Sequence, residues 1–319
     1  MRAAYPPLAD VSWLAAHLGD PSVRVIDCRW YLTGRGSGGA GAPGGVSGGA
    51  PAGREAYARG HIPGAVHLDV DADLAAVPGG GPGRHPIPEA AAFARTLSRV
   101  GVTPETCVVA YDDVGGAIAA RLWWLLRYFG HPVHRAGAPS GPISSAVRAG
   151  GRVLDGGLQA WVAAGHPLST EAPAIEPAPE MELVPGGALV ADKAAVDEHR
   201  RDPGVVILDA RARERFAGQI EPIDARAGHI PGARSAPYVE NLRAPAGAFL
   251  DRDALERRYR ELGALDARAV VCYCGSGVTA CHALLALAAL GRSDALLYEG
   301  SWSDWARDEA LPAATGSEP

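Results

Sequence analysis

Apolar residues along this chain fall into two patterns: short continuous runs, and longer segments in which they recur every three or four positions. Residues 23–27, 108–111, 205–209 and 269–273 are short runs rich in Val, which is typical of buried strands. Residues 117–129 and 279–290 have the spacing of helices. Strand and helix therefore alternate, which predicts an α/β fold in which helices cover both faces of a parallel sheet.

Four segments occur twice, in the same order, in the two halves of the chain. In the first half they are V-I-D-C-R, G-H-I-P-G-A, V-V-A-Y-D and D-G-G-L-Q-A-W, at residues 25–29, 60–65, 108–112 and 155–161. In the second half they are I-L-D-A-R, G-H-I-P-G-A, V-V-C-Y-C and E-G-S-W-S-D-W, at residues 207–211, 228–233, 270–274 and 299–305. The chain of 319 residues is thus predicted to hold two tandem domains of one architecture, 1–166 and 188–319, joined by a proline-rich extended linker at 167–187.

Residues 34–53 fit neither repeat. They consist almost wholly of Gly, Ala, Ser and Pro, so they have too few large side chains to bury. This composition predicts a flexible loop inserted into the first domain. Its place shortly after Trp30 and Tyr31 would let it sweep over the mouth of an active site.

Composition narrows the class of protein. The hydrophobic fraction of 47% suffices for packed cores, and a net charge of -6 argues against a nucleic-acid partner. Because the chain has neither an apolar run of about 18 residues nor the apolar core of a signal peptide, we expect a soluble, cytoplasmic protein without a membrane partner. The cysteines are odd in number and unevenly spaced, which favours a reduced compartment over a disulfide scaffold: Cys28, Cys107, Cys272, Cys274 and Cys281.

Three of these cysteines lie within residues 270–281. A zinc site is disfavoured because C-x-C is not the spacing of a zinc knuckle, and we expect no metal. Cys272 falls in a predicted strand and Cys281 in a predicted helix, so both are interpreted as structural.

Cys274 occupies a different position, a glycine-bounded turn between a strand and a helix. Gly275 and Gly277 let successive backbone N–H groups converge on the sulfur, and the helix that starts near Val278 adds the positive end of its dipole. Both effects favour a thiolate over a thiol and predict a nucleophile. The alternative is a buried, inert thiol.

Taken together, D-x-R, G-H-I-P-G-A, a strand that ends in cysteine and the closing E-G-S-W-S-x-W resemble the two-domain rhodanese family of sulfurtransferases across nearly the whole chain. The resemblance implies a catalytically silent first domain, in which Asp112 stands opposite Cys274. It implies that Cys274 takes a sulfane sulfur from a donor and passes it, as a persulfide, to cyanide, a small thiol or thioredoxin. No metal or organic cofactor is implied.

The loop C-G-S-G-V-T, residues 274–279, carries no basic residue and resembles the loop of 3-mercaptopyruvate sulfurtransferases. A loop of this kind suits a mono-anionic donor, and we assign donor contacts to four of its residues: Gly275, Gly277, Val278 and Thr279. By resemblance, Ser276 forms a proton relay with a histidine and an aspartate of the first domain. His85 in G-R-H-P and Asp71 in H-L-D-V-D match that pattern. A solvated loop residue is the alternative interpretation for each.

A donor carboxylate needs a cation, preferably a forked one. Arg215 in R-E-R-F matches the family's first substrate arginine. The second is expected nine residues later, where this chain has Asp224, and Arg226 is the nearest substitute. This departure leaves thiosulfate open as the main donor.

Two other functional classes can be weighed. Some cysteine phosphatases share this fold, but their longer loop ends in an arginine, where this chain has Val278 and Thr279. Some rhodanese-like domains are non-catalytic binding modules, and the presence of Cys274 argues against that class.

Overall fold

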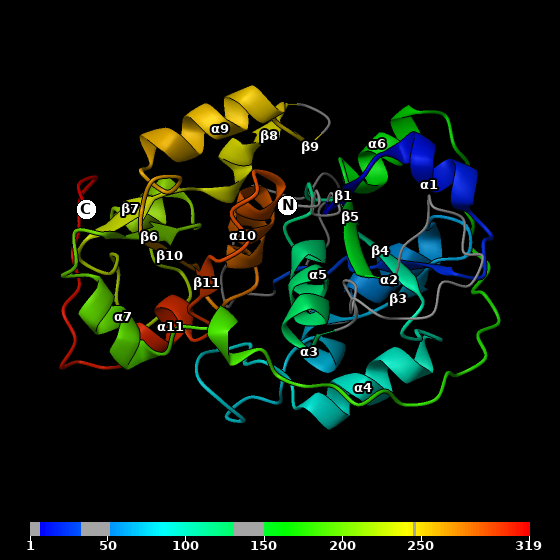
Figure 1. Cartoon of the computed structure of the whole chain (residues 1–319), viewed down its shortest axis with the longest axis horizontal. Helices are drawn as coiled ribbons and strands as arrows, with labels where there is room; N and C mark the ends of the chain where they lie inside the picture. Colours follow the sequence, from blue (N-terminus) through cyan, green and yellow to red (C-terminus); the bar gives the residue numbers. More distant parts are fainter. Residues whose placement is uncertain (1–6, 33–51, 131–149, 245–246) are drawn as a thin grey trace.

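The computed structural model in Figure 1 describes residues 7–32, 52–130, 150–244 and 247–319, which form two parallel sheets flanked by helices. The first sheet has the strand order β1-β5-β4-β2-β3, and its neighbouring strands are all parallel. Its elements are β1 (Leu8–Ala9), α1 (Val11–His17), β2 (Val23–Asp27), α2 (Ala52–Arg59), β3 (Val66–His67), α3 (Val70–Asp73), α4 (Ala90–Arg99), β4 (Cys107–Tyr111), α5 (Ala119–Tyr128), β5 (Gly150–Leu154) and α6 (Gly157–Ala163).

The second sheet repeats this plan with the order β11-β10-β6-β7, again parallel throughout. The register of β2 against β4 recurs as that of β6 against β10, residue for residue over five positions. Its elements are η1 (Gly187–Leu189), α7 (Lys193–His199), β6 (Val205–Asp209), α8 (Arg213–Phe216), β7 (Ala233–Ser235), η2 (Tyr238–Asn241), the short antiparallel pair β8 (Leu242–Arg243) and β9 (Ala248–Phe249), α9 (Arg252–Glu261), β10 (Ala269–Tyr273), α10 (Ala280–Ala289), β11 (Leu296–Leu297) and α11 (Ser301–Trp305).

Alternate residues of each central strand enter different cores, which is why these strands are apolar on both faces. In β6, Val206 and Leu208 join a core that contains α9 and α10, while Val205 and Ile207 join a second core with α7 and α11. The first sheet is likewise covered on both faces, by α4 and α5 on one and by α1 and α6 on the other. The predicted fold class, two tandem α/β domains with helices on both faces of a parallel sheet, is confirmed.

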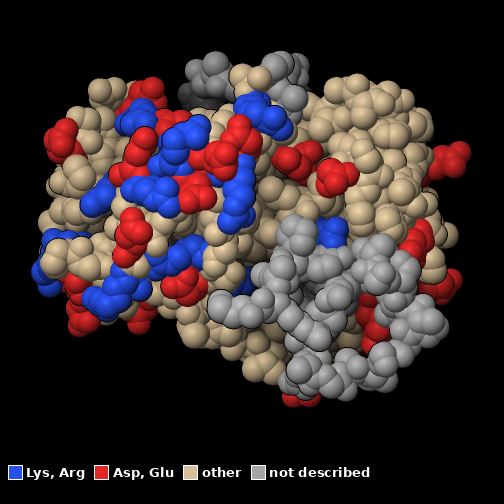
Figure 2. Space-filling view, turned by 45° about the horizontal axis from the view of Figure 1, so that its top comes forward, with Lys and Arg blue, Asp and Glu red and all other residues tan. Residues whose placement is uncertain are grey.

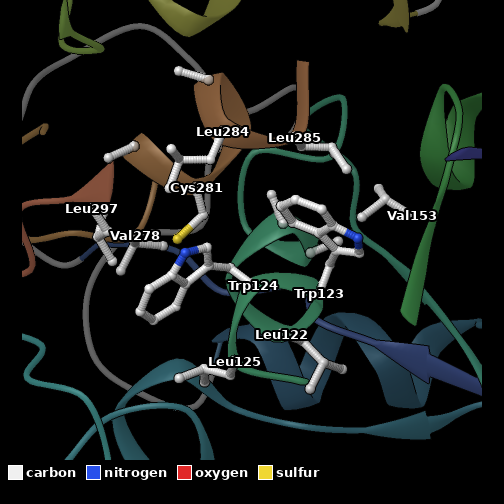
Figure 3. Packing of buried hydrophobic residues seen from close by; sticks show 14 of the residues in the cluster. Leu122, Trp123, Trp124, Leu125, Val153, Val278, Cys281, Leu284, Leu285 and Leu297 are labelled. Carbon is white, nitrogen blue, oxygen red and sulfur yellow. The ribbon is translucent and has the colours of Figure 1, made fainter. Parts of the chain in front are cut away.

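The two domains share one hydrophobic core where α5 packs against α10, near the centre of Figure 1. Figure 3 shows Trp123 and Trp124 of α5 facing Cys281, Leu284 and Leu285 of α10. Most of the side chains of both helices are buried, so these helices carry apolar residues on nearly every face. The interface between the two domains at α5 and α10, called the seam below, is therefore part of the hydrophobic core.

Two buried polar residues cross this seam in a reciprocal way. Arg121 of α5 donates to the carbonyl oxygen of Gly277 in the second domain at 3.2 Å, and His282 of α10 lies 3.1 Å from the carbonyl oxygen of Gly115 in the first. Burial lowers the pKa of His282 to about 4, so its ring is neutral near pH 7 and Nε2 carries the proton that binds Gly115. Each domain thus holds the strand-to-helix loop of the other.

The predicted linker is extended but is bound to the first domain. Ser169 forms a bridge with His61 of the G-H-I-P-G-A segment, and residues 170–186 contain neither helix nor strand. Further along, the Ala178 N–H donates to the Ser98 carbonyl at 2.9 Å, and the Gly186 N–H to the Tyr128 carbonyl at 2.7 Å. The segment follows the first domain until the second domain begins.

Most of the predicted glycine-rich insertion, residues 34–51, lies outside the described residues. Its last two residues belong instead to α2, so the predicted insertion ends two residues too late. Gly53 is required there by packing, because a Cβ at this position would lie 2.0 Å from the carbonyl oxygen of Arg29.

On the face shown in Figure 2, basic and acidic side chains are interspersed over the second domain, where α9 carries both signs. Within the described part of the chain, no helix has both the length and the apolar character needed to span a bilayer.

Candidate active site

Cys274 directly follows β10 and is almost fully buried, with 2% of its surface exposed. The N–H of Gly277 donates to its Sγ at 3.2 Å. Gly277 has φ +79°, and a Cβ there would lie 2.6 Å from the Glu299 carbonyl oxygen, so the loop needs glycine both for its conformation and for space. Helix α10 begins at Ala280, and its N-terminus lies at the end of the loop.

The closing E-G-S-W-S-D-W segment holds this loop in place. Ser301 Oγ accepts the Cys274 N–H at 3.1 Å, the Trp302 N–H donates to the Cys274 carbonyl at 2.9 Å, and the Ser303 N–H donates to the Gly275 carbonyl at 2.9 Å. Ser301 has φ +53°, a left-handed conformation in which it is alone among the described residues other than glycine. The sequence reasoning did not assign Ser301 a role, although the repeat of this segment marked the region.

The three residues of the predicted relay lie together across the domain boundary. His85 Nδ1 is 2.7 Å from Ser276 Oγ, and His85 Nε2 is 3.1 Å from Asp71 Oδ1. Ser276 and His85 are buried, whereas the Asp71 side chain is 57% exposed. Its hydrogen bond to His85 lowers the pKa of the Asp71 carboxyl. Such a chain can carry a proton between the loop and solvent.

Trp30 supports the far end of this relay. Its Nε1 donates to Asp71 Oδ2 at 2.8 Å, and its ring meets the His85 ring edge to face at 5.3 Å between centroids. The sequence reasoning missed Trp30, although it directly follows the D-x-R segment of the first domain.

Arg121 supports the near end of the relay. Its buried guanidinium donates to the His85 carbonyl at 3.0 Å and the Pro86 carbonyl at 3.2 Å, in addition to its bond to Gly277. One side chain therefore fixes the histidine segment of the first domain relative to the cysteine loop of the second. Arg121 lies inside a predicted apolar helix, and the sequence reasoning did not single it out.

Two guanidiniums lie beside the loop. A Cβ built on Gly275 would be 3.0 Å from Arg84 Nη2 and 3.5 Å from Arg215 Nη1. Arg215 was predicted as a donor-binding residue. Arg84 was missed, although it directly precedes His85. The first domain thus contributes a cation that the sequence reasoning sought only in the second domain.

Arg226, the predicted substitute for a second substrate arginine, is engaged elsewhere in the structure. Its guanidinium donates to four backbone carbonyls at the end of α11 and in the segment that follows, those of Trp305, Ala306, Asp308 and Leu311, at 2.9–3.2 Å. Through these hydrogen bonds Arg226 links the segment after α8 to the C-terminal segment.

The corresponding loop of the first domain surrounds a carboxyl group of the chain itself. The buried Asp112 carboxyl accepts N–H groups from Val114, Gly116, Ile118 and Ala119 at 2.7–2.9 Å. Burial raises the pKa of this carboxyl, while the four N–H groups act in the opposite direction. By the repeat, Asp112 occupies the position that Cys274 has in the second domain, so a side chain already fills this loop.

The other four cysteines are buried and free. Burial raises the pKa of Cys107 to about 11 and that of Cys281 to about 12, and it also raises those of Cys28 and Cys272. These thiols are therefore poor nucleophiles at neutral pH. Within the described ranges, no three or more His, Cys, Asp and Glu side chains are grouped so that they could hold a metal ion.

Comparison with known proteins gives one consistent result. Residues 10–164 and 192–308 each match the Rhodanese-like domain family. The chain is 41% identical over 307 residues to a probable 3-mercaptopyruvate sulfurtransferase of Pseudomonas aeruginosa, covering 95% of this chain and 96% of that one. It is 30% identical over 322 residues to the thiosulfate sulfurtransferase of Mus musculus, covering 96% and 94%.

Comparison with solved structures gives the same result. The crystal structure of SseA from Escherichia coli, a 3-mercaptopyruvate sulfotransferase by its description, matches with a TM-score of 0.73 and 29% identity. The match covers 94% of this chain and all of that one.

Proposed function

Because the chain belongs to the rhodanese family and is a sulfurtransferase, we propose that Cys274 carries the sulfur and that 3-mercaptopyruvate is its main donor. The main support for mercaptopyruvate as the donor is the chain of hydrogen bonds from Ser276 through His85 to Asp71. Thiosulfate is the alternative donor. The two differ in whether the leaving group must be protonated.

In the first step the Cys274 thiolate attacks the donor sulfur. The carbon–sulfur bond of mercaptopyruvate breaks, its electron pair stays on carbon, and the products are a Cys274 persulfide and the enolate of pyruvate. The proton that was on the donor's thiol must then reach the enolate carbon. Ser276 and His85 are placed to hold or pass that proton beside the loop. Thiosulfate leaves as sulfite and needs no proton.

In the second step the acceptor attacks the outer sulfur of the persulfide. Cyanide takes it to give thiocyanate, a small thiol takes it to give a new persulfide, and in each case the Cys274 thiolate returns. The Gly277 N–H, 3.2 Å from Sγ, and the N-terminus of α10 favour negative charge on the loop in both states. Thioredoxin is included among the proposed acceptors, and a cytoplasmic location would keep the five free thiols reduced.

In this proposal the first domain supplies no nucleophile, since Asp112 fills its loop, but it does supply His85, Asp71 and Arg84 to the active site. The domain limits 1–166 and 188–319 are part of the same proposal. Arg84 and Arg215 are the cations proposed to bind the donor's carboxylate, as forked groups beside Gly275.

A single-turnover experiment tests the persulfide. The enzyme is incubated with mercaptopyruvate, freed of small molecules and then treated with cyanide. We expect the intact mass to rise by one sulfur atom before cyanide is added, and one thiocyanate to be released per chain afterwards. Enzyme that turns over without ever gaining this mass would contradict a sulfur carried on the protein.

Ser276→Ala tests the relay. Because only mercaptopyruvate needs a proton, we expect kcat with mercaptopyruvate to fall about 10²-fold, a typical effect for general acid–base catalysis, and kcat with thiosulfate to change little. Steady-state thiocyanate formation with each donor measures this, and thiosulfate serves as the internal control. An equal loss with both donors would mean that Ser276 shapes the loop and does not move a proton.

A further inference from the structure

The closing E-G-S-W-S-D-W segment contacts the first domain as well as the loop before α10. Oε2 of Glu299 accepts the N–H of Ile87 at 2.9 Å, and Ser303 Oγ accepts the N–H of Arg84 at 3.1 Å. These two donors are the ends of a short stretch that contains His85, called the histidine segment below. The second domain therefore holds the histidine segment on both sides of its histidine.

The same closing segment holds the cysteine loop. Ser301 Oγ accepts the Cys274 N–H at 3.1 Å, and the backbone carbonyl of Glu299 lies so close to Gly277 that a Cβ there would be 2.6 Å from its oxygen. The backbone of Glu299 thus faces the cysteine loop while its side chain binds the histidine segment. One residue therefore contacts both parts of the relay.

We propose that Glu299 is a positioning residue, whose side chain keeps the histidine segment in register with the cysteine loop and so holds His85 Nδ1 at 2.7 Å from Ser276 Oγ. It acts through His85 and not on the donor itself. The inference rests on the proposed function, because it requires the relay to carry the proton of mercaptopyruvate. A displacement of about 1 Å at a catalytic group can cost about 10²-fold in rate, so one hydrogen bond that sets this distance affects turnover.

The first domain has a counterpart at the repeated position. Asp155, which opens D-G-G-L-Q-A-W, accepts the N–H of Phe249 in the second domain at 2.8 Å. Asp155 and Glu299 each lie just beyond a strand, β5 or β11, are half-buried and bind one backbone N–H of the opposite domain. The segment of Asp155 adjoins the loop without a nucleophile, since the Leu158 N–H donates to the Asp112 carbonyl at 2.9 Å. Asp155 therefore offers the same cross-domain contact without the relay.

Glu299→Ala, measured with each donor, is the direct test. We expect kcat with mercaptopyruvate to fall about 10-fold, because the relay is displaced and not removed, and kcat with thiosulfate, which needs no proton, to change little. Glu299→Gln keeps an oxygen that accepts the Ile87 N–H and should restore most of the lost activity. Adding Glu299→Ala to Ser276→Ala should cause no further loss, because both changes act on one relay.

Asp155→Ala is the matched control. It also removes the acceptor of one cross-domain hydrogen bond, so we expect its melting temperature to fall about as much as that of Glu299→Ala. Its kcat with mercaptopyruvate and with thiosulfate should stay at the level of the parent. The comparison separates a loss of domain contact from a loss of relay geometry.

The assignment is overturned if Glu299→Ala leaves mercaptopyruvate turnover unchanged or lowers kcat equally with both donors. It is also overturned if Glu299→Gln behaves like Glu299→Ala, or if Asp155→Ala shows the same loss with mercaptopyruvate. Failure of the proposed function would appear without any change at position 299: the parent would form no persulfide, or Ser276→Ala would lower both donors equally, and the inference would fall with it.

If Glu299→Ala does not fold, Glu299→Asp decides the question. Aspartate keeps the charge but is shorter by one methylene group, so its oxygens draw back from the Ile87 N–H. A loss of kcat confined to mercaptopyruvate supports the assignment. Unchanged turnover, or an equal loss with both donors, overturns it.

Discussion

Replacing Cys274 with serine is expected to lower turnover at least about 10⁴-fold with mercaptopyruvate and with thiosulfate alike. A serine hydroxyl is almost wholly protonated at neutral pH, and its oxygen cannot form a persulfide, so the covalent route is lost and not merely slowed. Losses of this size are typical when the nucleophile of a covalent enzyme is removed. Thiocyanate formation and intact-mass analysis of the same sample measure turnover and sulfur loading together.

Cys272→Ala is the matched control, because Cys272 lies two residues earlier and is also buried. Its pKa is raised by burial and it packs in the main core, so its removal should cost some stability but leave sulfur loading intact. If Cys274→Ser still gained a sulfur atom while Cys272→Ala did not, the nucleophile would have been assigned to the wrong thiol.

The repeated motifs and the apolar runs sufficed to predict the fold. Strands such as β6 are buried on both faces, so they appear in the sequence as unbroken apolar segments, and the duplication of each motif fixed their order in both domains. The predicted ends of the helices differ from the observed ones by a few residues. Helix α5 starts at Ala119 and not at Ala117, because the preceding glycines belong to the loop around Asp112.

The site could be predicted only where a motif marked it. Ser276, His85 and Asp71 were named from the family pattern, and His85 lies within hydrogen-bond distance of both Ser276 and Asp71. Arg84 was not found because its partner Asp224 is 140 residues away in sequence, in the other domain. The carbonyl contacts of Arg226 were not foreseen, because a sequence does not show which backbone carbonyls a guanidinium meets.

The same limit applies to the domain seam. Arg121 and His282 lie within helices that are otherwise apolar, where a polar residue gives no sign of its partner. In the folded chain each reaches the loop of the opposite domain. The proposed active site is therefore formed where the two domains meet, because the proposed nucleophile Cys274 comes from one domain and His85 from the other.

Gly277→Ala is expected to lower kcat at least about 10²-fold, comparable to the loss of one oriented donor at a charged reaction centre. The new Cβ would lie 2.6 Å from the Glu299 carbonyl oxygen, and backbone atoms on both sides leave no flexible side chain to yield. The loop must shift, and the Gly277 N–H then leaves the Cys274 Sγ to which it donates. Thermal unfolding and steady-state kinetics with mercaptopyruvate would be measured on the same preparation.

Gly291→Ala separates this clash from backbone strain. Gly291 also has a positive φ, of +94°, but an added Cβ there would have no heavy atom within 4 Å. Both substitutions carry the strain of a left-handed residue, about 1–2 kcal/mol, and only Gly277→Ala adds the collision with Glu299. We therefore expect Gly291→Ala to be destabilised but active. If the two variants lost activity equally, the close approach of Gly277 to Glu299 would have no part in holding the Cys274 loop.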